Sequence, residues 1–157
     1  MKKVLIGIDD SSSAMKAVEY VARLFEGKND LEIRLVHVLP NLPAMFWDEG
    51  HILSEAEKKE RQKVVDKWLA ERKAMMEPVF NKAVATLTGT GIKSRQIQTK
   101  SVSDSTDAAA SIIEEARDGG YGTIVVGRCD KTAKHLLGSV TSRIIDQGVG
   151  VAITIVE

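Results

Sequence analysis

Hydrophobic and polar positions along the chain divide it into two kinds of segment. Short β-branched runs such as 4–8 and 123–127 are almost continuously apolar, which is typical of strands buried on both faces. Between such runs, apolar residues recur at the three- to four-residue spacing of one helix face, as in 14–25. The pattern therefore predicts strands and helices in alternation.

Five strands and four helices are expected. The strands span 4–8, 32–39, 95–102, 123–127 and 151–156, and the helices span 14–25, 54–87, a segment from Asp104 or Ser105 to about 116, and 138–147. Ser54 and Glu57 form a capping-box signature, and Pro78 is expected to kink the long second helix or divide it in two. Alternation of this kind predicts parallel strands joined by right-handed crossovers, with helices on both faces. We expect one Rossmann-like, doubly wound α/β domain over residues 1–157.

Composition narrows the functional classes. Lys plus Arg and Asp plus Glu both number 22, so the formal charge is zero, which argues against a broad nucleic-acid-binding surface. The apolar run near the N-terminus meets Asp9 too early for a secretory core, and no stretch approaches the ~20 apolar residues of a membrane span. The single cysteine, Cys129, excludes an intrachain disulfide and suits a reducing compartment. We expect a cytoplasmic protein that binds neither membrane nor nucleic acid.

Candidate ligand-binding residues follow the two most apolar strands. In parallel sheets, ligands bind beyond the carboxyl ends of strands, where the strand order reverses. The runs 4–8 and 123–127 are expected to be central neighbours, and they are followed by Asp9-Asp10-Ser11 and by Gly127-Arg128. Gly138-Ser139 then opens a helix, whose free N–H groups and positive dipole end favour phosphate. The sequence therefore predicts a nucleotide site at this edge.

Each of these residues also has a purely structural explanation. Asp9 can end a strand and support the next helix, and Ser139 can be a plain N-cap. Gly127 and Gly138 can serve a turn and close helix–strand packing. The sequence leaves both explanations open.

Catalytic and metal-binding signatures are missing from the sequence. His51, His135 and Cys129 share no metal-ligand spacing, so no metal site is expected. There is no Ser-His-Asp or Cys-His set, and the turn at 9–13 is not a Walker loop. We expect slow ATP hydrolysis at most.

Several motifs together resemble the universal stress protein family. They are Ile6-Gly-Ile-Asp9-Asp-Ser11, Leu35-Val-His-Val38, Val125-Val-Gly127 and Gly138-Ser139-Val-Thr-Ser-Arg-Ile144. The resemblance covers the whole chain. It implies a five-stranded parallel sheet in the order 3-2-1-4-5 and a homodimer paired through the final strand, Val151–Val156.

The resemblance also implies a set of ligand contacts. Asp9 and the Val38 backbone would meet adenine, Val126 and Gly127 would lie along the ribose, and Gly138, Ser139, Val140 and Thr141 would wrap the phosphates. Arg128 stands in the loop beside them, and Mg²⁺ would be held through the phosphates. The implied function is that of a stress-response sensor or regulator that binds ATP or a related adenine nucleotide.

One departure keeps an alternative open. ATP-binding members carry the pattern G-x2-G-x9-G-[ST], whereas this chain has Asp130 at the second glycine and a shorter loop, 128–137, between the outer glycines. A carboxylate facing polyphosphate is repelled, although the loop also carries Lys131 and Lys134. The alternative is a nucleotide-free family member that acts only as a dimeric protein-interaction module.

Overall fold

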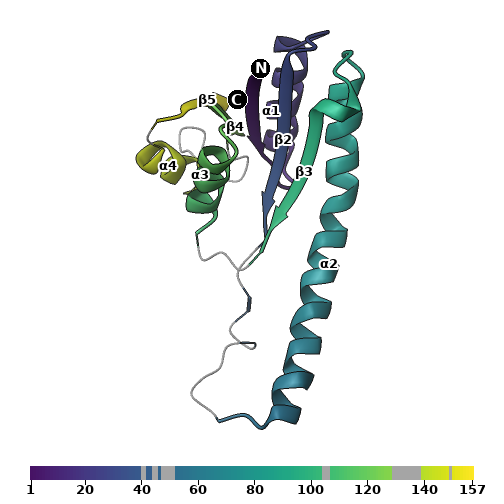
Figure 1. Ribbon diagram of the computed structural model, residues 1–157, viewed down its shortest axis with the longest axis vertical. Helices are drawn as coiled ribbons and strands as arrows, with labels where there is room; N and C mark the ends of the chain where they lie inside the picture. Colours follow the sequence, from purple (N-terminus) through teal and green to yellow (C-terminus); the bar gives the residue numbers. More distant parts are fainter. Residues whose placement is uncertain (40–41, 44–45, 47–51, 104–106, 129–138, 149) are drawn as a thin grey trace.

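A five-stranded parallel sheet forms the centre of the structure, with helices packed against it (Figure 1). The computed structural model describes residues 1–39, 42–43, 46, 52–103, 107–128, 139–148 and 150–157. The strand order is β3-β2-β1-β4-β5. The α/β class and the doubly wound topology expected from the sequence are therefore confirmed.

The elements follow the predicted alternation. Their bounds are β1 Lys2–Gly7, α1 Ser12–Leu24, β2 Leu31–Val38, α2 Glu55–Thr88, a 3₁₀ turn Ser94–Gln96, β3 Ile97–Val102, α3 Ala108–Asp118, β4 Thr123–Gly127, α4 Ser139–Gln147 and β5 Ala152–Val156. Most boundaries differ from the sequence-based ones by one or two residues. The larger difference is at α3, where Asp107 is the N-cap and accepts hydrogen bonds from Ala109 N and Ala110 N. The predicted start at Asp104 or Ser105 was therefore too early.

The two strands that are most apolar in sequence lie side by side. β1 pairs with β2 on one edge and with β4 on the other, with Ile6 opposite Leu35 and Val125. Val4, Leu5 and Ile6 are all buried. A strand that is buried on both faces and paired on both edges needs a continuous apolar run, which explains the pattern of residues 4–8. The strand order reverses between β1 and β4, as the sequence predicted.

Two hydrophobic cores lie on opposite faces of the sheet. One contains Val4 and Ile6 of β1 with apolar residues of α1 and the C-terminal half of α2. The other contains Leu5 of β1 with apolar residues of α3 and α4. Because side chains alternate along a strand, one apolar run supplies both cores.

Helix α2 is longer than the sheet that it covers. Its 34 residues span about 51 Å, and its N-terminal half extends beyond the strands (Figure 1). The predicted capping box is present, with Glu57 N bonded to Ser54 Oγ at 3.2 Å and Ser54 N bonded to Glu57 Oε2 at 2.7 Å. The helix runs through Pro78 without a break, so of the two expected effects, a kink or a division, the division does not occur. Pro78 is exposed, and water can therefore satisfy the carbonyl group that the proline leaves unpaired.

Charged groups near the amino ends of the strands are matched with one another. Tyr121 Oη donates to Glu32 Oε1 at 2.6 Å, and Lys3 Nζ lies 3.6 Å from Glu32 Oε2. The hydrogen bond from Tyr121 holds the pKa of Glu32 below its usual value, while burial and that same bond raise the pKa of Tyr121. This end of the sheet is a structural ion-pair network, and the candidate site lies at the opposite end.

Candidate functional site

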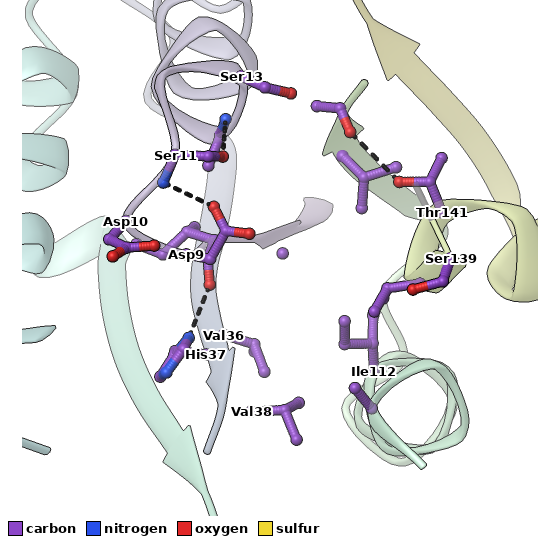
Figure 2. A pocket seen from close by; sticks show the side chains of 17 residues that line it. Asp9, Asp10, Ser11, Ser13, Val36, His37, Val38, Ile112, Ser139 and Thr141 are labelled. Carbon is purple, nitrogen blue, oxygen red and sulfur yellow. Dashed lines mark hydrogen bonds between the residues drawn. The ribbon is translucent and has the colours of Figure 1, made fainter. Parts of the chain in front are cut away.

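A cavity opens at the carboxyl ends of β1 and β4, where the strand order reverses (Figure 2). Its volume is about 260 Å³. Its lining comes from β1 and the turn after it, α1, the end of β2, α3, the end of β4 and the start of α4: Gly7, Ile8, Asp9, Asp10, Ser11, Ser13, Ala14, Val36, His37, Val38, Ala108, Ile112, Val126, Gly127, Ser139, Val140 and Thr141. Six elements thus converge on one hollow.

The turn after β1 forms one wall. Asp9 Oδ1 accepts a hydrogen bond from Ser11 N at 2.9 Å, and Ser11 Oγ accepts one from Ala14 N at 3.1 Å. Ser11 is therefore the N-cap of α1, and Asp9 supports the turn that leads into it. This confirms the structural role predicted for Asp9. The carboxylate also lies on the wall of the cavity, across from Ser139 and Thr141 (Figure 2).

Glycine at the end of β4 is required by a close approach of α1. A Cβ atom built on Gly127 would lie 2.2 Å from the carbonyl oxygen of Ser13 and 2.4 Å from its Oγ. Ser13 is itself buried, in the first turn of α1. The predicted packing role of Gly127 is therefore present, and the same contact brings the end of β4 and the start of α1 together at the cavity.

Apolar side chains form the floor of the cavity. Val36 and Val38 come from β2, and Ile112 comes from α3 (Figure 2). Ala108, at the start of α3, also lines the cavity. His37 lies on the rim, with its Nδ1 3.0 Å from the carbonyl oxygen of Ile8, so this nitrogen is the N–H donor. A floor of this kind suits a flat, largely apolar ring.

The start of α4 forms the wall opposite Asp9. Thr141 is buried and donates its hydroxyl hydrogen to Gly127 O at 3.2 Å, while Ser139 and Val140 are exposed. The first N–H groups of a helix have no partner within the helix, and its dipole is positive there. This wall can therefore hold an anionic group.

The structure brings most of the predicted site residues together. Seven line the cavity: Asp9, Val38, Val126, Gly127, Ser139, Val140 and Thr141. Arg128 is not among the lining residues, because its guanidinium group pairs with Glu157 beyond β5. Gly138 lies outside the described residues, as do Asp130 and the rest of the loop from 129 to 137.

Sequence reasoning missed several lining residues. Ala108 and Ile112 reach the cavity from α3, and Ser13 reaches it from the inner side of α1. Their apolar or small character predicted burial but not this location. The location of His37 at the cavity could have been predicted, because it adjoins Val38 at the carboxyl end of a strand.

The charged residues among the described residues that line the cavity are acidic. Asp9 and Asp10 line the cavity, and among the described lining residues there is no lysine or arginine. Within the part of the chain that the structure describes, no three His, Cys, Asp or Glu side chains form a group suited to a metal ion. The described cavity therefore offers carboxylate acceptors, hydroxyl groups and backbone N–H groups, and no preformed cation site.

Comparison with known proteins gives a family match and a set of similar folds. The model of the universal stress protein family matches residues 1–148. No match was found among curated protein sequences. None of the helices described by the structure combines the length and hydrophobicity needed to cross a membrane.

Three solved structures illustrate the likeness of fold. A universal stress protein from Archaeoglobus fulgidus in complex with dAMP is 15% identical, with 100% of this chain and 98% of that chain covered and a TM-score of 0.60. An Arabidopsis thaliana family protein with AMP bound is 16% identical, with 99% and 91% covered and a TM-score of 0.60. A universal stress protein in complex with cAMP is 16% identical, with 99% and 96% covered and a TM-score of 0.63.

Proposed function

The chain belongs to the universal stress protein family, and on that premise we propose that it binds ATP or a related adenine nucleotide in the cavity between β1 and β4. It acts as a cytoplasmic stress-response sensor or regulator, with nucleotide occupancy biasing the order of the surrounding loops and the binding of partners. The observation that carries the proposal is the composition of the cavity. An apolar floor, a carboxylate wall and a helix start face one another across a single hollow.

Each part of the cavity matches one part of the ligand. The base lies on the apolar floor near Val38, where Asp9 accepts hydrogen bonds from amino or hydroxyl groups. The ribose runs along Val126 and Gly127, and the phosphates meet the start of α4 at Ser139. Mg²⁺ would be held through the phosphates and would reduce their repulsion by Asp9 and Asp10.

Ligand titration tests this assignment. Calorimetry with ATP, ADP, AMP and cAMP, each with Mg²⁺, is expected to give saturable binding, and GTP is expected to bind less tightly. A ligand at about 100 times its Kd should stabilise the fold by about 2.7 kcal/mol, raising the Tm by roughly 5–11 °C. Asp9→Ala and Ser139→Ala should reduce that rise.

The opposite outcome is equally clear. If millimolar ATP, ADP, AMP and cAMP all leave the Tm unchanged, the nucleotide proposal fails. The nucleotide-free interaction module then becomes the better account of the chain. ATP found on the purified protein after denaturation would exclude that alternative.

A second copy of the chain completes the proposal. β5 is the last strand of the sheet, and its bonds to β4 include Ala152 N to Gly122 O and Arg128 N to Val156 O. Because backbone groups alternate in direction along a strand, those of Ile153 and Ile155 face the free edge. An apolar edge strand of this kind is a template for pairing. We expect a homodimer formed through the final strand, Val151–Val156.

The molar mass in solution tests the dimer. Light scattering should give twice the 17.1 kDa chain mass. Ile155→Pro removes an outward N–H group while sparing the ladder to β4, so it should shift the protein to monomer. Ile155→Ala is the matched control, because it loses the side chain but keeps the N–H group, and it should stay dimeric. A wild-type protein of monomer mass would contradict the pairing.

A further inference from the structure

An ion pair joins two helices that line the cavity, α3 and α4. The Nη2 atom of Arg143, in α4, donates to Asp107 Oδ2 at the N-cap of α3. Arg143 lies one turn after Ser139 and Val140, and Asp107 directly precedes Ala108. All three of these neighbours line the cavity. The ion pair therefore links the anion-binding start of one helix to a helix that carries the apolar floor.

Asp107 is itself fixed in place. Its Oδ1 accepts hydrogen bonds from Ala109 N at 3.0 Å and from Ala110 N at 3.2 Å, which leaves Oδ2 to bind Arg143. The carboxylate is about three-quarters buried, whereas Arg143 is about half exposed. The aspartate is thus a rigid anchor, and the arginine is the part that reaches it.

Helix α4 depends on such anchors. It has only nine residues, and helices shorter than ~12–15 residues are marginal without tertiary contacts. Ile144 is fully buried, and Thr141 is bonded to Gly127 O. These two contacts hold α4 to the sheet. Among the described residues, the bond from Arg143 is a polar contact that holds α4 to α3.

We propose that Arg143 is a positioning residue that, through Asp107, aims the start of α4 at the phosphate of the bound nucleotide. The inference rests on the function proposed above. It assigns affinity for the phosphorylated part of the ligand to this ion pair, and affinity for the nucleoside part to the apolar floor. A surface pair of this exposure adds little to overall stability, so its loss should leave the protein folded.

Two ligands and three variants separate these contributions. Calorimetry is performed with AMP and with adenosine on wild type, Arg143→Met, Asp107→Asn and the double variant. Asn caps a helix about as well as Asp, so Asp107→Asn removes the charge and keeps the cap. Each single variant should bind AMP about two- to fivefold more weakly than the wild type does. The affinity for adenosine should be unchanged. The double variant should be no weaker than either single one.

Controls distinguish positioning from general effects. Arg143→Lys keeps the charge and should restore part of the affinity for AMP. Arg23→Met removes an exposed, ion-paired arginine from α1, outside the cavity lining, and should bind both ligands as wild type does.

Several results would overturn the inference. Unchanged AMP affinity in both single variants would refute it while leaving the proposed function intact. Weaker AMP binding in Arg143→Met alone would mean that Arg143 contacts the phosphate directly, without acting through Asp107. Equal losses for AMP and adenosine would show a general structural role. If the wild type binds neither AMP nor adenosine, the proposed function is refuted, and the inference that rests on it is refuted as well.

Discussion

Gly127→Ala is expected to destabilise the folded protein by about 3 kcal/mol, the upper end of the range for overpacking a core. The new methyl group would lie 2.2 Å from a backbone oxygen of Ser13, and Cβ contacts under 3.0 Å are essentially never seen. A flexible side chain could rotate away, but the first turn of α1 is fixed by its cap at Ser11. Either α1 or β4 must therefore shift. Urea unfolding measures the loss, and the Tm should fall by roughly 6–12 °C.

Gly122→Ala provides the matched control, because Gly122 lies just before the same strand and a Cβ there would meet nothing within 4 Å. It is expected to change the free energy of unfolding by no more than about 0.5 kcal/mol. Equal stability of the two variants would contradict the packing explanation for Gly127. A stable Gly127→Ala protein that loses nucleotide binding would assign the glycine to the ligand alone.

Ala108→Phe is expected to weaken nucleotide binding strongly while leaving the fold intact. Ala108 is the first residue of α3, is half-buried and lines a cavity of about 260 Å³, so an aromatic ring at this position would occupy the space of the base. The first turn of a helix tolerates phenylalanine, and the added apolar surface has a hollow to fill. Loss of a well-fitted base should weaken AMP binding at least about 100-fold, or about 2.7 kcal/mol. Calorimetry measures the affinity, and circular dichroism checks the fold.

Ala110→Phe is the control for this variant. It makes the same change two residues along α3, at a half-buried position outside the cavity lining, and should bind AMP as wild type does. Wild-type affinity in Ala108→Phe would show that the ligand binds elsewhere. Loss of AMP binding in both variants would indicate that the substitutions distort α3, and that the phenylalanine ring does not act by filling the cavity.

Local patterns in the sequence predicted the α/β class and the central pair of strands. The continuous apolar runs at β1 and β4 predicted central, adjacent strands, because only strands covered on both faces need every side chain to be apolar. The polar residues after those strands marked the edge at which ligands bind in parallel sheets. Asp9 and Gly127 were therefore named as site residues, the family resemblance added Thr141, and all three line one cavity.

Predictions that depended on contacts between distant segments were less successful. The sequence analysis placed Arg128 in the loop beside the ligand; in the structure it pairs with Glu157 and does not line the cavity, so its contact with a ligand stays a prediction. It offered Asp104 or Ser105 as the start of α3, whereas Asp107 has the geometry to bond both the helix N–H groups and Arg143. Pro78 was expected to be able to divide α2, and the exposure of that position allows the helix to continue.

The sequence by itself determined the alternation of elements, the central strands and the edge of the sheet that carries the site. These follow from periodicity and turn chemistry, which are properties of neighbouring residues. Only the tertiary structure decided that α3 supplies Ala108 and Ile112 to the cavity, that Gly127 makes room for the backbone of α1, and that Arg143 ties α4 to Asp107. Those contacts join segments far apart in the chain. Their geometry is set by how whole helices pack on the sheet, which no local pattern specifies.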